Sequence, residues 1–96
     1  MTKLDRKFQG TLTKVKDGSV VPDDQWIVFL AKDAALLTAL YAYLAECKRL
    51  GADNAQIASV RRLIADVEIW QEVHPELVKV PDIASGEKLL GLPEAP

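Results

Sequence analysis

Residues 33–74 read DAALLTALYAYLAECKRLGADNAQIASVRRLIADVEIWQEVH, and this stretch decides the fold. Apolar residues recur in both of its halves at spacings of three and four. That period matches one face of a helix, so the stretch predicts two amphipathic helices, over residues 33–50 and 54–74. The expected core positions are Leu36, Leu40, Tyr43, Cys47 and Leu50, beside Leu37, Tyr41 and Leu44, in the first helix, and Ile57, Val60, Leu63, Ile64, Val67 and Trp70 in the second.

The residues around these segments predict their ends. Asp33 is expected to cap the first helix, and Gly51 is expected to close it in a left-handed conformation. Asp53 and Gln56 have the spacing of a reciprocal capping box at the start of the second helix, which Pro75 should end. So short a connection predicts an antiparallel helical hairpin.

Residues 1–31 are expected to form a β element. Residues 7–15 alternate as a half-buried strand does, and Asp17-Gly18 favours a two-residue type I′ turn that would place Val20 opposite Val15. The run from Trp26 to Ala31 is apolar throughout, which predicts a strand buried on both faces.

Together these segments predict a single α+β domain over residues 1–96. An N-terminal β-hairpin or three-stranded antiparallel meander packs on an antiparallel two-helix hairpin, and residues 75–96 form an irregular, extended tail rich in Pro and Gly.

Composition narrows the class of protein. The 96 residues are 49% hydrophobic and 27% charged, which is typical of a soluble globular chain. No apolar run could span a bilayer, and the first residues do not resemble a signal peptide, so we expect a cytoplasmic location. The net charge of −2 combines a basic leader over residues 1–16 with an acidic remainder, but without interleaved aromatic residues a nucleic-acid site is not favoured.

The sequence does not predict an enzyme, a metal site or a cofactor. Its one cysteine and one histidine, Cys47 and His74, fall on different helices. Cys47 reads as a small buried hydrophobe, and His74 as a group at a helix C-terminus.

Three groups of residues are candidates for ligand binding. Cations flanking the turn between the helices could hold an anion. Aromatic side chains could stack on a planar ligand such as a nucleobase. The irregular segment after the second helix mixes polar and rigid residues, as functional loops do. The candidates are Lys48, Arg49, Arg61 and Arg62 for the first group, Trp26 and Tyr41 for the second, and His74, Lys79 and Asp82 for the third.

The apolar surface of the first helix is wider than one neighbouring helix can cover. This excess, with the two-faced run at residues 26–31, predicts a homo-oligomer formed through one of these two elements.

The chain also resembles a group of small bacteriophage and prophage proteins without an assigned function. The resemblance lies in the Asp17-Gly18 turn and in residues 26–33, 47–52, 74–76 and 79–82. It implies an accessory gene product in the cytoplasm of the host cell, of a kind that includes inhibitors of host defence, regulators and small structural factors.

We therefore expect a non-enzymatic accessory binding protein, such as a counter-defence inhibitor, that captures a host protein or a small, anionic, nucleotide-like ligand stoichiometrically. An oligomeric assembly adaptor is the alternative. A DNA-binding regulator that uses Lys14 and Lys16 is a third and less favoured reading.

Overall fold

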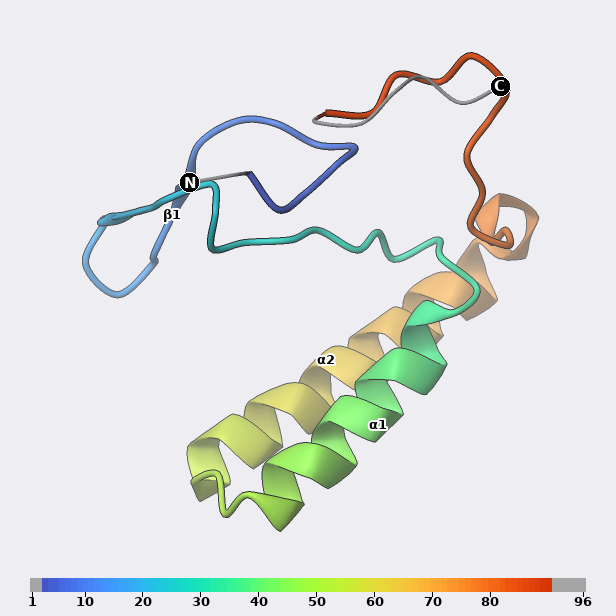
Figure 1. Ribbon diagram of the computed structural model, residues 1–96. Helices are drawn as coiled ribbons and strands as arrows, with labels where there is room; N and C mark the ends of the chain where they lie inside the picture. Colours follow the sequence, from blue (N-terminus) through green and yellow to red (C-terminus); the bar gives the residue numbers. More distant parts are fainter. Residues whose placement is uncertain (1–2, 91–96) are drawn as a thin grey trace. The chain divides into compact units, whose positions relative to one another are not determined.

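The computed structural model describes residues 3–90 and contains two helices, a two-stranded antiparallel sheet and one 3₁₀ turn (Figure 1). It is a small α+β fold, as the sequence predicts. The chain divides into two compact units, one formed by Met1–Val28 with Asp82–Pro96 and the other by Phe29–Pro81. The predicted tail over residues 75–96 ends outside the described residues, which stop at Leu90.

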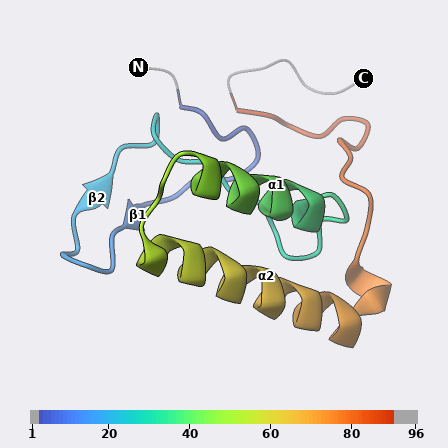
Figure 2. The same cartoon turned by 90° about the horizontal axis from the view of Figure 1, so that it is seen from below.

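The helical hairpin forms as expected. Helix α1 spans Leu36–Arg49 and helix α2 spans Asn54–Val73, and they lie antiparallel, side by side (Figures 1 and 2). Gly51, with a φ of 76°, lets the Ala52 amide donate to the Cys47 carbonyl and its own amide donate to Lys48. These two bonds form a Schellman motif, which closes α1 and turns the chain back at once.

The two helix starts differ from prediction. Asp53 caps α2, because its carboxylate accepts the Gln56 amide at 2.8 Å, but the Gln56 side chain reaches toward the Tyr43 hydroxyl instead of completing the box. Asp33 is not the N-cap of α1. Its carboxylate accepts from the Ala35 amide in a turn before the helix, and Ala35 occupies the cap position without a side-chain bond.

Fewer residues are buried in the seam between the two helices than the apolar pattern predicts. Leu36 and Cys47 of α1 and Val60, Ile64 and Val67 of α2 are buried. Three predicted core residues of α1 are not, since Tyr41 and Tyr43 are each 52% exposed and Leu50 is 69% exposed, and Leu63 of α2 is 49% exposed as well. Two helices bury only the stripes that face each other, so residues on the flanks of each helix stay in solvent.

After α2 the chain turns back toward the start of the hairpin. His74 is the C-cap of α2, and Pro75–Leu77 form the 3₁₀ turn η1. Lys79 then pairs with Asp33 in a parallel bridge, in which the Lys79 amide donates to the Lys32 carbonyl and the Ala34 amide donates to the Lys79 carbonyl. These bonds anchor the segment beyond η1 to the entry of α1.

In the first unit, strand β1, Leu12–Thr13, pairs with strand β2, Val20–Val21. The predicted reversal at Asp17-Gly18 is present, but its register is not, because Val20 lies opposite Thr13. A type I′ turn needs positive φ at two residues, and in this loop only Gly18 has it. The loop is therefore longer than two residues.

The prediction of a strand buried on both faces at Trp26–Ala31 is wrong, and with it the three-stranded meander. Among the described residues this run pairs with no strand. Trp26 is buried, whereas Ile27 and Phe29 are exposed. Leu30 is also exposed and Ala31 lies in a turn, so exposure does not alternate along the run. Without a neighbouring backbone to complete a ladder, these residues do not form a strand.

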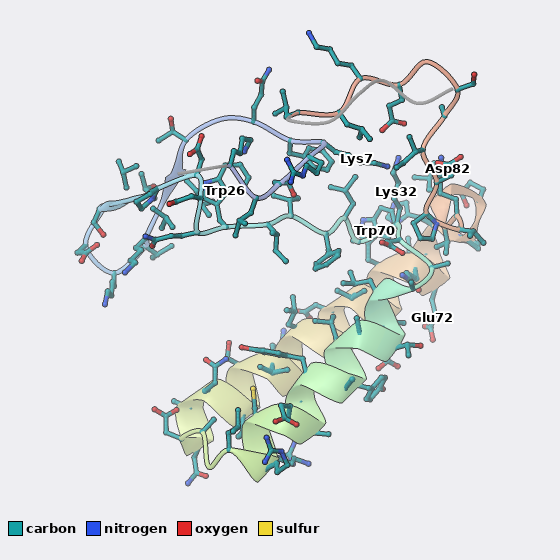
Figure 3. The ribbon with its side chains drawn as sticks, viewed as in Figure 1. Lys7, Trp26, Lys32, Trp70, Glu72 and Asp82 are labelled. Carbon is teal, nitrogen blue, oxygen red and sulfur yellow. The ribbon has the colours of Figure 1, made fainter. Side chains whose placement is uncertain are left out.

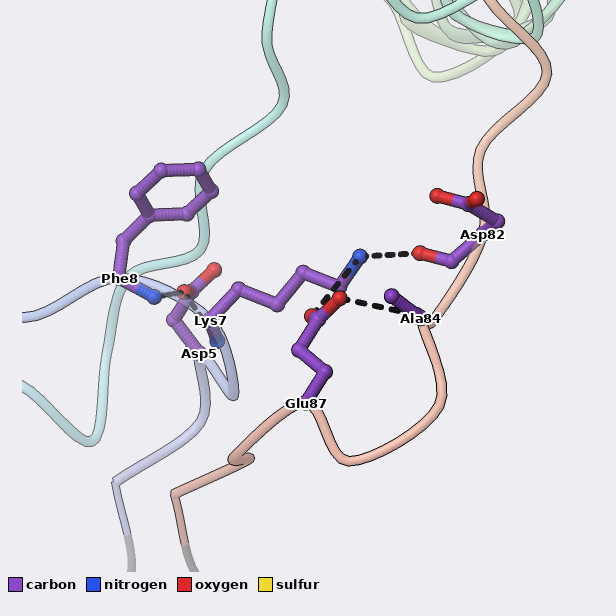
Figure 4. A network of polar contacts seen from close by, with 6 residues as sticks. All are labelled: Asp5, Lys7, Phe8, Asp82, Ala84 and Glu87. Carbon is purple, nitrogen blue, oxygen red and sulfur yellow. Dashed lines mark hydrogen bonds and ion pairs between the residues drawn. The ribbon is translucent and has the colours of Figure 1, made fainter. Parts of the chain in front are cut away.

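Asp5 holds the first unit together. Its buried carboxylate accepts hydrogen bonds from the amides of Lys7, Phe8 and Val28. Close by, Lys7 donates to the Asp82 carbonyl and pairs with Glu87, which in turn accepts from the Ala84 amide (Figure 4). These contacts tie residues 82–90 to the start of the chain.

Candidate functional site

The helical unit carries an open hollow of about 480 Å³ at the end of the hairpin where α1 begins and α2 ends. Helix α1 contributes an apolar side chain to it, the last turns of α2 contribute polar ones, and the segment around η1 contributes the rest. Its lining residues are Leu37, Glu68, Gln71, Glu72, Pro75 and Val78. Glu72 projects from the C-terminal part of α2 (Figure 3).

Hydrogen bonds fix two of these side chains. The Tyr41 hydroxyl donates to Glu68 across the two helices, with an oxygen to oxygen distance of 2.6 Å. The Gln71 amide nitrogen donates to the carbonyls of Ala31 and Asp33, at 2.9 and 3.2 Å. Both contacts hold the hollow's walls in place without using the second carboxylate, that of Glu72.

The hollow is electrostatically negative. Glu68 and Glu72 are one helical turn apart on α2, and the C-terminal end of a helix dipole adds partial negative charge. The last turn of α2 contains no basic residue. The hydrogen bond to Glu68, with some burial and the charge of that carboxylate, raises the pKa of Tyr41 above its usual 10.0. This hollow suits a positively charged group and disfavours a phosphate.

The four cations expected at the turn are all exposed, and the structure pairs two of them locally. Arg49 bonds Glu46 on α1, and Arg62 bonds Asp66 on α2 at 3.1 Å. Arg61 and Arg62 are consecutive and so project about 100° apart around the helix. Across residues 3–90 no hydrogen bond or ion pair joins Lys48, Arg49, Arg61 and Arg62 to one another. The anion site they would form stays a prediction.

The two aromatic candidates have different environments. Trp26 is 8% exposed and lies under the Lys3 ammonium, which sits 3.7 Å from the centre of the ring. This cation–π contact occupies the face that a planar ligand would need. Tyr41 has an exposed ring, but its hydroxyl is engaged by Glu68.

The three candidate residues after α2, which are His74, Lys79 and Asp82, make contacts within the fold. The His74 ring stacks on Trp70 with 4.5 Å between centroids, and its Nδ1 lies 3.0 Å from the Trp70 carbonyl. The backbone of Lys79 bridges to Asp33, and the carbonyl of Asp82 accepts from Lys7. Of the expected site residues only Tyr41 contacts the lining of the hollow through a bond described above.

Sequence reasoning missed the hollow's polar lining. The candidates expected from the sequence include none of Glu68, Gln71 and Glu72. Their spacing, with two carboxylates at i and i+4 and an amide between them, was the available signal, yet it does not reveal that η1 folds back beside them.

Among the described residues, no group of three or more His, Cys, Asp or Glu side chains is placed to hold a metal ion. Neither described helix is both long enough and apolar enough to cross a membrane. Comparison with protein-family models, with curated proteins and with solved structures found no match to this chain.

Proposed function

We propose that this protein is a non-enzymatic binding protein, an accessory factor of a phage or prophage, that captures a partner protein stoichiometrically in the host cytoplasm. The observation that carries the proposal is the open acidic hollow where α1 begins and α2 ends, at which the Tyr41 hydroxyl bonds Glu68. A hollow that combines Leu37, Pro75 and Val78 with two carboxylates fits a lysine or arginine side chain, whose stem is apolar and whose head is cationic.

The hollow's charge guides the choice between the two expected ligands. A nucleotide brings phosphates, which Glu68 and Glu72 repel, so a protein partner with an exposed basic residue is favoured. A nucleotide-like ligand would instead require the cations near the turn, two of which are already paired.

Immobilised full-length chain tests this proposal with a bacterial lysate. We expect one dominant partner retained at a fixed molar ratio, released by raised salt because screening weakens surface charge pairs. Glu72→Lys should abolish retention. Glu76→Lys makes the same charge change outside the lining and should leave retention intact.

Retention that survives Glu72→Lys unchanged contradicts the proposal. A thermal shift with a nucleotide would point to the other ligand class, and at a hundredfold excess over the dissociation constant it would correspond to about 2.7 kcal/mol.

An assembly adaptor is the second candidate, because the side of α2 away from α1 also exposes large apolar residues. Ile69 is 58% exposed and Val73 is 65% exposed. In that function the oligomer itself would be the product.

A further inference from the structure

Helix α2 has a second face that no described part of the helical unit covers. It begins at Ala55 and ends at Val73, and its members are spaced four, three, four, three and four residues apart. The residues of this face, hereafter the outer face, are Ala55, Ser59, Arg62, Asp66, Ile69 and Val73, and all of them are exposed. This is the spacing of the a and d positions of a coiled coil, occupied here by two small residues, a central ion pair and two large apolar residues. The opposite side of the helix, with Ile64 and Val67, is already buried in the hairpin.

We propose that the outer face pairs with the same face of a second copy of this chain, with the two α2 helices antiparallel about a two-fold axis level with Ile64. In that register Arg62 lies opposite Asp66 of the second copy. Ser59 lies opposite Ile69, and Ala55 lies opposite Val73. Each layer occurs twice, as a two-fold axis requires.

Charge selects this arrangement. Antiparallel pairing sets each Arg62 against an Asp66, so both charges at the centre are complemented. Parallel pairing would set Arg62 beside Arg62 and Asp66 beside Asp66, which places like charges together. The antiparallel arrangement also opposes the two helix dipoles.

Side-chain size agrees with charge. The large β-branched residues of the face, Ile69 and Val73, lie in the C-terminal half of α2, while the small ones, Ala55 and Ser59, lie in the N-terminal half. Antiparallel pairing therefore packs large against small in every outer layer. Leu63, which is half exposed, flanks the centre and would meet Leu63 of the second copy. The paired stretch is about 27 Å long at 1.5 Å per residue.

The central ion pairs determine the register of the two helices more than they contribute to the free energy of association. Arg62 already bonds Asp66 within its own helix, and an exposed pair of this kind contributes little. Arg62 has five donors, so it can keep that bond and also reach Asp66 of the second copy. Charged residues at a central layer specify alignment at some cost in affinity.

This pairing differs from the sequence expectation, which placed association on the first helix or on residues 26–31. It goes beyond partner capture and does not depend on it, because the hollow and the outer face are different surfaces of the helical unit. Variants of one surface should leave the other function intact, so the two proposals fail separately.

A charge-swap experiment tests the dimer. By sedimentation equilibrium the full chain should show twice the 10.6 kDa of a single chain. Arg62→Asp and Asp66→Arg, made separately, place four like charges at the centre and should each give monomers. Mixed in equal amounts, the two variants restore opposite charges at every contact and should return the doubled mass. Arg61→Asp is the matched control, since its residue projects away from the outer face, and it should remain dimeric.

Crosslinking checks the register independently of charge. The double variant Ser59→Cys with Ile69→Cys should form disulfide-linked dimers on mild oxidation, and Ser59→Cys alone should not. A monomeric wild-type chain at high concentration overturns the proposal. So does a dimer that tolerates Arg62→Asp, a mixture that stays monomeric, or a double cysteine variant that does not crosslink.

Discussion

The hydroxyl of Tyr41 on α1 donates to the Glu68 carboxylate on α2, and this bond of 2.6 Å ties the two helices at the rim of the acidic hollow. Because Glu68 interacts more strongly with the protonated phenol, it holds the pKa of Tyr41 above 10.0. The bond should therefore persist at neutral pH and be lost only as the pH rises through that elevated pKa.

An alkaline titration checks this contact. In a Tyr43→Phe background Tyr41 is the chain's remaining tyrosine, so the absorbance of ionised tyrosine reports it alone. Glu68→Gln should move the titration to lower pH, whereas Glu76→Gln should leave it in place. A midpoint that is identical with and without the Glu68 charge would show that the bond does not form in solution.

Asp5→Asn should loosen the first unit. The amide keeps the shape of the carboxylate but weakens three hydrogen bonds to backbone amides, and bonds to charged groups contribute about 1.5–3 kcal/mol each. We expect a clear loss of free energy of unfolding, with faster amide exchange at Phe8 and Val28. Asp23→Asn changes an exposed carboxylate and serves as the control. Equal exchange rates in the two variants would contradict the role given to Asp5.

Acid should destabilise the first unit, because it protonates the Asp5 carboxylate. Burial alone would raise the pKa of Asp5, but the amides of Val28, Phe8 and Lys7, with the charge of Lys3, outweigh burial and lower that pKa below 3.8. A lowered folded pKa means that the ionised form stabilises the fold above pH 3.8 and that this contribution disappears as the pH falls through the folded value.

Trp26 reports this transition, since it is buried in the same unit. In wild type its near-ultraviolet circular dichroism should be constant at neutral pH and decline only as the pH falls below 3.8. In Asp5→Asn the loss of signal that protonation of Asp5 causes in wild type should be missing. A wild-type signal that declines already between pH 6 and pH 5 would contradict the lowered pKa.

Asp53→Ala should destabilise α2. The Asp53 carboxylate accepts the Gln56 amide, and removing such a cap costs about 1 kcal/mol. Urea unfolding should show this loss, and Asp53→Ser, which can still cap, should recover most of it. If alanine and serine unfold alike, the cap contributes nothing.

Ile64→Ala should cost about 3 kcal/mol, because it opens a cavity in the narrow buried seam. Leu50→Ala removes a side chain that is largely exposed, so its cost should be about 0.5 kcal/mol or less. Similar losses for the two variants would mean that the seam is wider than the structure shows.

The comparison of prediction with structure separates local from non-local information. The helical hairpin was predictable because its signals are local: a helical period, a glycine at Gly51, a cap at Asp53 and a proline at Pro75. The prediction for residues 26–31 failed because it required knowledge of a neighbour, whereas the cap expected at Asp33 and the register expected at Asp17-Gly18 failed in their local geometry. The run from Trp26 to Ala31 has the composition of a strand, but a strand exists only where another backbone accepts its hydrogen bonds.

The candidate site likewise contains residues that the sequence could predict and residues that it could not. Sequence reasoning found Tyr41 but not its partner Glu68, and it missed Asp5, whose burial depends on Val28 donating from a distant part of the chain. Nothing local distinguishes these two carboxylates from solvated ones.

The sequence by itself determined the two helices, the cap of α2 at Asp53 and the tight reversal at Gly51, because each depends on residues within one or two helical turns. Tertiary structure alone decided which stripe of each helix is buried, that Glu68 and Glu72 line an open hollow beside η1, and that the outer face of α2 is exposed. Burial depends on what packs opposite a residue. A helical period of apolar residues predicts that some surface packs there but does not identify that surface.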